Sequence, residues 1–600
     1  MSSPPTRQFI HYPPAVATDQ PFSAPPPGTN PVVRGLLLRY GASLITSVGA
    51  IQQFLYNSNG FSRLQEVKGL DAVECRFDPT VIPAAQDASA TVETGTYTRP
   101  SEFGAVEADA GAGRYYSVLD FHKAYTEGRF TPTDVAEALL PLIRRDVEEP
   151  TSHSVAWMDT KVELVRKAAE EATKRYQAGT PIGILDGVPV AVKDEVDLKG
   201  YTRCLGTKDD HTHPLDATSY CVTKWEEEGA VVVGKLSMHE IGLDTTNNNP
   251  NHGTPHNPHN PDFYTGGSSG GSAYAVGAGL IPIALGADGG GSIRIPSSFC
   301  GIYGLKTSHS RVSIRPTASL AISNSVAGPM AANMVDLEVA YRVMAIPDPS
   351  HSLSSTFLPP ARPHDPPRKL LGIYKPWFDR AEPAVRDVCQ AALNHMTSQQ
   401  GYSLVDISIP FLVEGGQAHA ITILSEIASG FPSARATNLT PANRVLLAVA
   451  GRARAQDLLA AQRVRNALMQ HLAHLYRAHP GLIIVTPTTP LAGWAIGDGD
   501  LSDGVSDGDR SIRNMEYVWL ANFTGCPALS MPVGYVAPGT GQGDIPVGLM
   551  GMGEWGAEEE LIRWGFDGEG WLREGWEGGR QRAGAWVDVV GLAEEKGERS

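Results

Sequence analysis

A glycine- and serine-rich block at residues 265–306 constrains the fold more than any other part of this chain. The block reads TGGSSGGSAYAVGAGLIPIALGADGGGSIRIPSSFCGIYGLK, and it holds two glycine clusters, at 266–272 and 289–292, separated by an apolar, alanine-rich run. Glycine tolerates positive φ and lets the backbone approach a ligand or a reacting atom closely. The two clusters therefore predict two backbone turns that meet in one place, and that place is the candidate active site.

The composition is that of a folded, soluble protein with a large core. Hydrophobic residues make up 42% and charged residues 19% of the 600 residues, which leaves enough apolar sequence for a sizeable interior. The net charge is −16 at pH 7, and no stretch rich in lysine and arginine provides an electrostatic footprint for nucleic acid. We therefore expect no nucleic-acid partner, and we interpret the negative charge as a contribution to solubility.

The six cysteines favour a reduced, cytoplasmic protein. They are scattered and show no C-x-x-C spacing for zinc or redox chemistry, so we expect free thiols in the core. Residues 1–31 are rich in proline and polar residues and lack the basic start and apolar core of a secretory signal. We expect residues 1–32 to form a disordered tail.

Residues 33–113 form an N-terminal extension to which the sequence assigns no role. Its first part, residues 36–56, is long and apolar enough for a membrane span, but Arg39 and two glutamines interrupt it, and charge inside a membrane is costly. We expect a packed amphipathic helix and no integral membrane span, with attachment to a membrane surface as the alternative. Further along, residues 91–98 alternate in the manner of a strand.

Helices and strands alternate after the extension. A threonine followed by proline predicts a capped helix over 131–145, and apolar spacing predicts a second helix over 161–176. Residues 187–194 are typical of an apolar strand, 216–228 of a helix and 230–234 of a buried strand. The order strand, helix, strand predicts an α/β fold with a mainly parallel sheet.

Ser292, in the second glycine cluster, is the candidate nucleophile. A serine in a tight glycine turn with backbone N–H groups around it supplies the nucleophile and the oxyanion hole that acyl transfer needs. The hydroxyl also needs a base, and because Ser292 itself does not lie in a G-x-S-x-G elbow, a histidine base would have to come from elsewhere. The alternative base is Lys193, at the end of the apolar strand, where burial would favour the neutral amine.

Each of these signals also has an ordinary structural interpretation. A Gly-Gly-Ser sequence is most often a loop, and a Lys-Asp pair after a strand usually lies on the surface. Glycine clusters also bind phosphate, but the pattern G-x-x-x-x-G-K-[ST] is absent, which argues against a nucleotide-binding P-loop. Taken singly the signals are weak, and only their combination is specific.

Four segments together resemble the amidase signature family. They are GVPVAVKD at 187–194, VVVGKLSMHE at 231–240, GGSSGGSA at 266–273 and ADGGGSIRIP at 287–296, and their order and separation agree with the family. The resemblance implies an α/β amidase signature fold, with a mixed, mainly parallel central sheet covered by helices. It also implies one catalytic domain over residues 114–600.

For the site, the resemblance implies a Ser-Ser-Lys triad that hydrolyses a carboxylic amide of a small molecule without a cofactor. Lys193 would be the base, Ser268 the bridging serine and Ser292 the nucleophile that forms an acyl-enzyme. In this family the bridging serine follows a cis peptide bond, which here would join Gly267 and Ser268.

The resemblance also implies which residues support the triad. The oxyanion would be held by backbone N–H groups of the second glycine cluster, those of Gly289, Gly290, Gly291 and Ser292. Three side chains match supporting positions and are expected to orient the triad without reacting, namely Ser269, Asp288 and Arg294.

Two further clusters are candidate metal sites. His252, His256 and His259 lie close together, and histidine is the commonest metal ligand, but a loop rich in proline and asparagine need not converge on an ion. The aspartates between 498 and 509 are spaced somewhat like a calcium loop, but Asp503 stands where an EF-hand needs glycine. Because the family uses no metal, we expect polar loop residues in the first cluster, a solvated acidic loop in the second and no metal in either.

Alternative functions stay open at this point. One branch of the family is the A subunit of the tRNA-dependent amidotransferase, which hydrolyses glutamine and passes ammonia to a partner. A non-catalytic member of the fold is another alternative, although it would not require the intact triad. Segments at 242–264 and 410–493 are expected to shape the pocket. The identity of the amide and the oligomeric state, a homodimer included, stay open.

Overall fold

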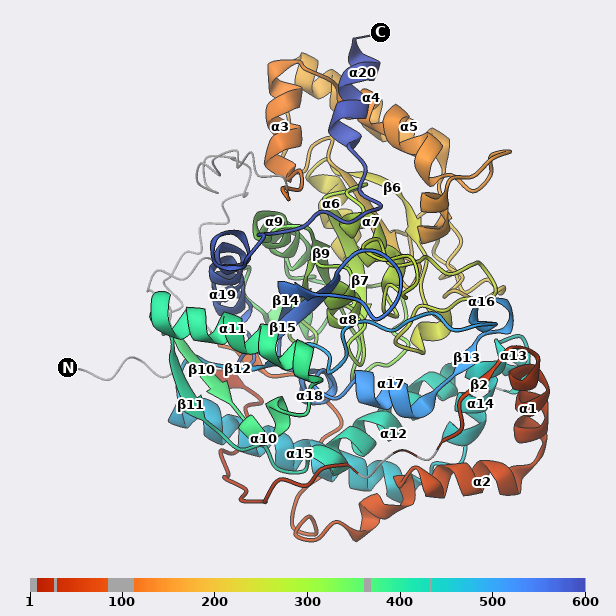
Figure 1. Cartoon of the computed structure of the whole chain (residues 1–600), viewed down its shortest axis with the longest axis vertical. Coiled ribbons are helices and arrows are strands. Elements are labelled where there is room, and N and C mark those ends of the chain that lie inside the picture. The colour runs from red at the N-terminus through yellow and green to blue at the C-terminus, as the bar shows by residue number, and fades with distance from the viewer. Residues whose placement is uncertain are drawn as a thin grey trace.

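The computed structural model describes residues 8–25, 28, 30–84, 113–360, 368–431 and 433–598. Its centre is a mixed sheet of eleven strands within these residues (Figure 1). In sheet order the strands are β11 (Ser403–Asp406), β10 (Leu370–Ile373), β12 (Leu482–Pro487), β15 (Ile545–Met552), β14 (Ala528–Val536), β8 (Tyr303–Lys306), β9 (Val326–Ala331), β7 (Ile283–Asp288), β5 (Pro189–Lys193), β6 (Val231–Leu236) and β4 (Trp157–Asp159).

The sheet is mixed, as predicted, but its parallel pairs are confined to two groups. Strands β10, β11 and β12 pair in parallel at one side, and β5, β6 and β7 pair in parallel at the other. The strands between them pair antiparallel, which the prediction of a mainly parallel sheet did not include. One reason is local, because β14 and β15 follow each other in the chain through a short loop, and such a connection joins antiparallel strands.

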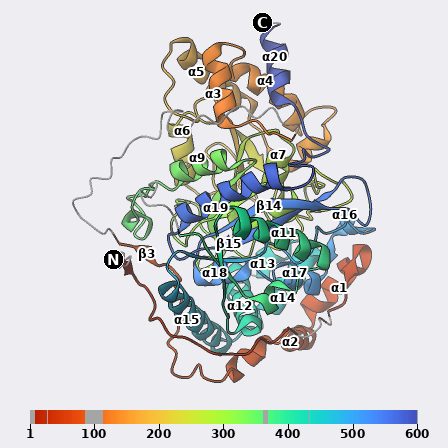
Figure 2. The same cartoon turned by 60° about the vertical axis from the view of Figure 1, so that its left-hand side comes forward.

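Helices surround the sheet, and two groups of them lie at its ends. At one end lie α3 (Val118–Glu127), α4 (Pro132–Ile143), α5 (Val162–Gln177) and α20 (Val589–Gly597) (Figure 1). The other end holds α1 (Gly35–Ser47), α2 (Gly49–Ser58), α12 (Leu412–Gly430), α14 (Pro441–Ala450) and α15 (Ala455–Ala478), and Figure 2 shows the same separation after rotation.

The remaining helices pack along the sheet or in the loops between strands. The remaining helices are α6 (Tyr220–Glu227), α7 (Gly270–Gly277), α8 (Arg294–Phe299), α9 (Met334–Met344), α10 (Lys375–Phe378), α11 (Pro383–Gln399), α13 (Ser433–Ala436), α16 (Asp500–Asp503), α17 (Gly508–Asn514), α18 (Trp519–Thr524) and α19 (Glu558–Gly570). Among them, α11 and α19 pack on β14, and α8 packs against β14 and β15.

The predicted helices and strands between residues 131 and 234 are confirmed. Helix α4 begins after Thr131, whose side chain accepts the N–H of Asp134 at 3.2 Å, and Pro132 occupies the first helical position. Helix α5 and α6 match the second and third predicted helices within a few residues. Strands β5 and β6, joined through α6, are parallel and buried along their whole length, as the strand–helix–strand order predicts.

The predicted amphipathic helix of the extension is two helices, α1 and α2, which meet at Val48. Leu38 and Ala42 on α1 are buried, and α1 packs on α14. The outward side is also apolar, because Leu37 and Tyr40 are more than 70% exposed. In the described ranges no helix combines the length and the apolar character needed to cross a bilayer.

The first residues differ from the prediction of a disordered tail. β1 (Phe9–Ile10) pairs antiparallel with β3 (Ile82–Pro83), and the Tyr12 hydroxyl donates to the Glu554 carboxylate at 2.7 Å. Phe22 packs edge-on against Tyr374. Aromatic side chains in this proline-rich segment supply the buried contacts that stabilise it on the core. Residues 1–7 and the predicted strand at 91–98 lie outside the described residues.

Candidate functional site

Lys193 is the last residue of β5, and the strand delivers its side chain into the protein interior. The lysine is fully buried. Its Nζ lies 2.9 Å from Ser268 Oγ and 3.2 Å from the carbonyl oxygen of Ala287. The structure therefore joins the predicted base and the predicted bridging serine, which are far apart in the sequence.

Ser268 lies in the first glycine turn, directly before α7. The peptide bond between Gly267 and Ser268 is cis, as expected from the resemblance. A side chain at Gly267 would lie 2.6 Å from the backbone nitrogen of Asn247, so only glycine fits. The carbonyl oxygen of Ser268 accepts the N–H of His239 at 3.1 Å, which fixes the turn on the neighbouring loop.

Ser292 lies in the second glycine turn, between β7 and α8. Its carbonyl oxygen accepts the N–H of Ser269 at 3.1 Å, so a backbone hydrogen bond joins the two turns. Gly291 has φ +114°, and a side chain there would meet Val518 at 2.6 Å. Ser268 and Ser292 line the same cavity, which confirms that the two glycine clusters meet in one place.

Asp288 and Arg294 form a fully buried ion pair behind the second turn. Arg294 donates from Nε and Nη2 to both carboxylate oxygens of Asp288, each at 3.0 Å. Burial alone would raise the pKa of Asp288, but the charge and hydrogen bonds of Arg294 hold this pKa well below its usual range. Asp288 also accepts the N–H of Gly291 at 2.7 Å, so this predicted oxyanion donor is engaged by the carboxylate.

Ser269 supports the site through the backbone of β7. Its hydroxyl donates to the carbonyl oxygen of Ala287 at 3.1 Å and accepts the N–H of Ala287 at 3.3 Å. Ala287 is also a neighbour of Lys193 Nζ. Ser269 therefore holds the strand segment that contacts the lysine, and it points to backbone atoms and not into the cavity.

Three residues of the site were missed by the sequence analysis. Asn522, on α18, donates to Asp288 Oδ1 at 2.9 Å and accepts from Arg294 at 2.6 Å. His419, on α12, donates from Nε2 to the carbonyl oxygen of Gly289 at 2.8 Å, and burial lowers the pKa of His419 to about 4.

The third missed residue, Glu195, contacts the lysine, and its Oε2 lies 2.8 Å from Lys193 Nζ. The sequence held no signal for Asn522 and His419, because both come from distant helices, whereas Glu195 lies two residues after the lysine.

A mainly apolar cavity of about 270 Å³ opens at the two serines. The predicted pocket segment at 410–493 contributes side chains of α12 and α14 to its wall. The N-terminal extension contributes the facing wall, which the sequence did not predict. The apolar residues that the two walls supply include Leu38, Ala42, Ile45, Ile423, Ile427 and Val449.

The three clustered histidines each bond to the backbone of the protein. His252 Nε2 lies 2.7 Å from the carbonyl oxygen of Thr207, His256 Nδ1 2.7 Å from that of Pro261, and His259 Nε2 3.2 Å from that of Cys300. Across the described stretches, no group of three or more histidine, cysteine or acidic side chains is arranged to hold a metal ion.

The aspartate-rich loop differs from the predicted solvated loop, because it binds the extension. Asp500 is fully buried, accepts from the Tyr264 hydroxyl at 2.9 Å and pairs with Arg34 at 3.0 Å. Asp509 accepts the backbone N–H of Asn30 at 2.8 Å. Both carboxylates are engaged in contacts with residues that are distant in the sequence.

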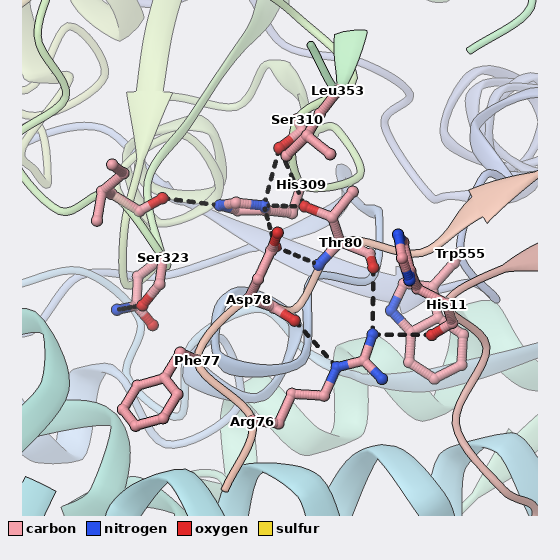
Figure 3. A network of polar contacts seen from close by, with 12 residues as sticks. His11, Arg76, Phe77, Asp78, Thr80, His309, Ser310, Ser323, Leu353 and Trp555 are labelled. Atoms are coloured by element: carbon pink, nitrogen blue, oxygen red, sulfur yellow. Dashed lines mark hydrogen bonds and ion pairs between the residues drawn. The ribbon is translucent and has the colours of Figure 1, made fainter. Parts of the chain in front are cut away.

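A second set of serine, histidine and aspartate lies away from the cavity, around His309 (Figure 3). The Nε2 of His309 donates to the carbonyl oxygen of Ile322 at 2.9 Å, and Nδ1 accepts from the hydroxyls of Thr80 and Ser310 at 2.7 and 3.1 Å. Asp78 lies 3.7 Å from the same Nδ1. A catalytic relay needs the carboxylate and the hydroxyl on opposite ring nitrogens, so this network is an anchor for residues 76–80 and not a triad.

Comparison with known proteins points the same way as the geometry. A family model described as Amidase matches residues 144–562. The chain is 35% identical over 465 residues to a fatty acid amide hydrolase of Medicago truncatula, covering 75% of each chain. It is 30% identical over 467 residues to the A subunit of the glutamyl-tRNA(Gln) amidotransferase of Thermus thermophilus, covering 73% of this chain and 93% of that one. A solved structure described as an amidase superposes with a TM-score of 0.65 at 25% identity, covering 76% of this chain and 99% of that chain.

Proposed function

The chain belongs to the amidase family, and from that premise we propose that it hydrolyses amides that carry a long apolar acyl chain, with Ser292 as nucleophile. The observation that carries the proposal is the 2.9 Å contact between Lys193 Nζ and Ser268 Oγ at the end of a cavity that Ser292 also lines. A buried amine beside a hydroxyl is a proton acceptor in a low-dielectric site, and a serine nucleophile needs such an acceptor.

In the proposed reaction, Lys193 starts as the neutral amine. Ser292 transfers its proton to Ser268 as its Oγ attacks the amide carbonyl, and Ser268 passes its own proton to Lys193. When the tetrahedral intermediate collapses, the carbon–nitrogen bond breaks and a proton returns through Ser268 to the leaving nitrogen. Water then hydrolyses the acyl-enzyme by the same relay, which releases the carboxylic acid.

The developing negative charge on the carbonyl oxygen is assigned to backbone N–H groups of the second glycine turn. Because the N–H of Gly291 donates to Asp288, the proposal relies on the N–H groups of Gly289, Gly290 and Ser292. His419 supports this assignment, since its hydrogen bond to the carbonyl oxygen of Gly289 holds the Gly289–Gly290 peptide, which carries the N–H of Gly290.

The apolar acyl group is inferred from the walls of the cavity. Side chains of α1, α12 and α14 are almost all aliphatic there, so burial of a long acyl chain is favourable by about 0.8 kcal/mol per methylene. The similarity to a protein named as a fatty acid amide hydrolase supports the same choice. Glutamine, the substrate of the amidotransferase alternative, would place a charged amino acid against this apolar surface at a large desolvation cost.

The test combines covalent labelling with a series of substrates. The full-length protein is incubated with a fluorophosphonate probe, the modified residue is mapped, and hydrolysis of primary amides with acyl chains of increasing length is measured. We expect labelling at Ser292 and a kcat/KM that rises about fourfold per added methylene until the cavity is full.

The matched variant is Ser292→Ala, which removes one oxygen atom and leaves the glycine turn intact. We expect this variant to keep the melting temperature of the wild type and to lose both labelling and hydrolysis. Full activity in folded Ser292→Ala would refute the assignment of the nucleophile, and a preference for the shortest amides would refute the acyl-chain assignment.

A further inference from the structure

We propose that Glu195 is a positioning residue for Lys193, the proposed base. The Glu195 carboxylate orients the amine so that its free electron pair faces Ser268, and it stabilises the ammonium that forms when Lys193 takes up a proton. The inference rests on the proposed function, because it takes Lys193 as the base. It adds a fourth side chain to the Ser-Ser-Lys set, and this side chain lines the cavity and lies against the lysine.

The local backbone explains how Glu195 reaches the lysine. β5 ends at Lys193, and the N–H of Val196 donates to the carbonyl oxygen of Lys193 at 3.2 Å, which closes a tight turn. The turn sends the Glu195 side chain back along the lysine, with Oε2 at 2.8 Å from Nζ. The side chain of Glu195 is 7% exposed and that of Lys193 is 0% exposed, so water screens this pair weakly.

The three neighbours of the amine match the hydrogen-bonding capacity of a neutral lysine. A neutral amine has two N–H donors and one electron pair. The carbonyl oxygen of Ala287, at 3.2 Å, and the carboxylate of Glu195, at 2.8 Å, are both acceptors and take the two N–H groups. The electron pair is then left facing Ser268, whose hydroxyl is the neighbour able to donate a proton.

The other charged groups around the lysine have their own partners. Asp194 pairs with Lys235 at 2.8 Å, and Asp288 pairs with Arg294. His239 also faces the lysine, and burial lowers the pKa of His239 to about 3, which keeps this ring neutral. The Glu195 carboxylate also accepts from the Ser325 hydroxyl at 3.5 Å, and its backbone carbonyl oxygen accepts from Arg203 at 3.3 Å. The carboxylate of Glu195 is therefore the negative charge placed directly against the amine.

The role of Glu195 follows from where the proton goes. When Ser292 attacks, one proton moves from Ser292 to Ser268 and another from Ser268 to Lys193, so a positive charge appears 2.8 Å from a fixed carboxylate. The carboxylate of Glu195 takes no part in either proton transfer. A carboxylate that orients a base and stabilises its protonated form does for this lysine what the aspartate does for histidine in a Ser-His-Asp triad.

The test is the pH dependence of covalent labelling at Ser292 in Glu195→Gln. Glutamine keeps the size and the hydrogen-bond acceptor but removes the charge. We expect the second-order rate constant for the fluorophosphonate to fall at least tenfold on the alkaline plateau. We also expect the acidic limb of the rate profile to move to lower pH, because the ammonium form has lost its counter-charge.

Two further variants separate this role from a structural one. Glu195→Asp keeps the charge on a shorter side chain, so its acidic limb should stay with the wild type while its plateau falls. Glu338→Gln removes a buried carboxylate of α9 that pairs with Arg342 at 2.8 Å and does not line the cavity, and its rate profile should match the wild type. Burial lowers the pKa of Lys306 to about 7. Because Lys306 is present in all of these variants, its titration does not contribute to the differences between their rate profiles.

The outcomes are distinct. An acidic limb and plateau in Glu195→Gln that match those of Glu338→Gln would overturn the assignment of Glu195 while leaving Ser292 as the nucleophile. Absence of labelling at Ser292 in the folded wild-type protein would overturn the proposed function, and the role of Glu195 with it.

Discussion

Arg34 Nη1 lies 3.0 Å from Asp500 Oδ1, and this ion pair joins the start of the N-terminal extension to a buried carboxylate near the other end of the chain. The same aspartate accepts from the hydroxyl of Tyr264, which belongs to the segment leading into the glycine block. The extension is thereby held against the site, where α1 forms one wall of the cavity.

Replacing Arg34 by alanine should loosen the extension. Asp500 would stay buried without its cationic partner, and because Arg34 itself is one-third exposed, we expect a loss of only about 1 to 2 kcal/mol in the free energy of unfolding. The measurement is urea denaturation together with the rate of limited proteolysis within residues 30–60. Arg39→Ala, at an exposed position of α1, the helix that begins directly after Arg34, is the control, and equal effects of the two variants would contradict the role of the ion pair.

Filling the cavity from the side of the extension should change the preference for acyl chains. Ala42 lies fully buried on α1 and lines the cavity, so Ala42→Trp should shorten the space beside the serines. We expect kcat/KM for amides with 16 or more carbons to fall roughly tenfold to hundredfold, and that for a butyramide to change little. Leu44→Trp, on the exposed side of the same helix, is the matched control. An equal loss on short and long amides would argue against a wall formed by α1.

Removing Arg294 should destabilise the protein strongly. Arg294→Ala leaves the carboxylate of Asp288 buried without its cation, which we expect to cost about 3 to 5 kcal/mol in a denaturation experiment. Arg166→Ala, which breaks an exposed ion pair with Glu137, should cost less than about 1 kcal/mol. Similar losses in the two variants would contradict the importance of the buried pair.

The same pair predicts a response to acid. The folded-state pKa of Asp288 is depressed by Arg294, so the stability from this group is present above pH 4 and is lost as the pH falls below that value. Arg294→Ala should therefore unfold with a weaker dependence on pH between 4 and 2 than the wild type. Curves that differ by a constant amount over this range would contradict the linkage.

His419→Ala should lower kcat without raising KM. The ring holds the carbonyl oxygen of Gly289, and a small displacement of the glycine turn misplaces the N–H groups proposed to bind the oxyanion. We expect kcat to fall roughly tenfold to hundredfold, with partial recovery in His419→Gln, whose side-chain amide can donate to the same oxygen. Unchanged kcat in His419→Ala would contradict the role of the imidazole ring in positioning the glycine turn.

Local sequence patterns predicted the parts of the fold that depend on near neighbours. The proline after Thr131 predicted the start of α4, and the apolar run before Lys193 predicted a buried strand that carries the lysine to its end. The two glycine clusters predicted that Ser268 and Ser292 lie in turns that meet. In the first two cases the physical cause is contained in a short run of neighbouring residues, and the two glycine turns are separated only by α7 and β7.

The parts that the sequence did not predict depend on distant segments. Asn522 and His419 reach the second glycine turn from α18 and α12, and nothing in their own neighbourhoods distinguishes them from other polar residues on helices. The antiparallel centre of the sheet arises because β8, β9, β14 and β15 pair across long connections or a hairpin. The aromatic side chains that fix residues 8–25 are sparse among prolines, so composition indicated disorder where individual contacts stabilise the segment.

The wall contributed by α1 also sets an order of events during synthesis. Its packing partners α14 and α16 lie some hundreds of residues later, so α1 leaves the ribosome long before the surface it packs on exists. Contacts of such sequence separation form late, after the closure of a very long loop. Until then the apolar side chains of α1 are exposed to water on both sides of the helix, which makes this segment prone to association. The cavity is consequently completed by some of the first residues to be translated and among the last to be docked.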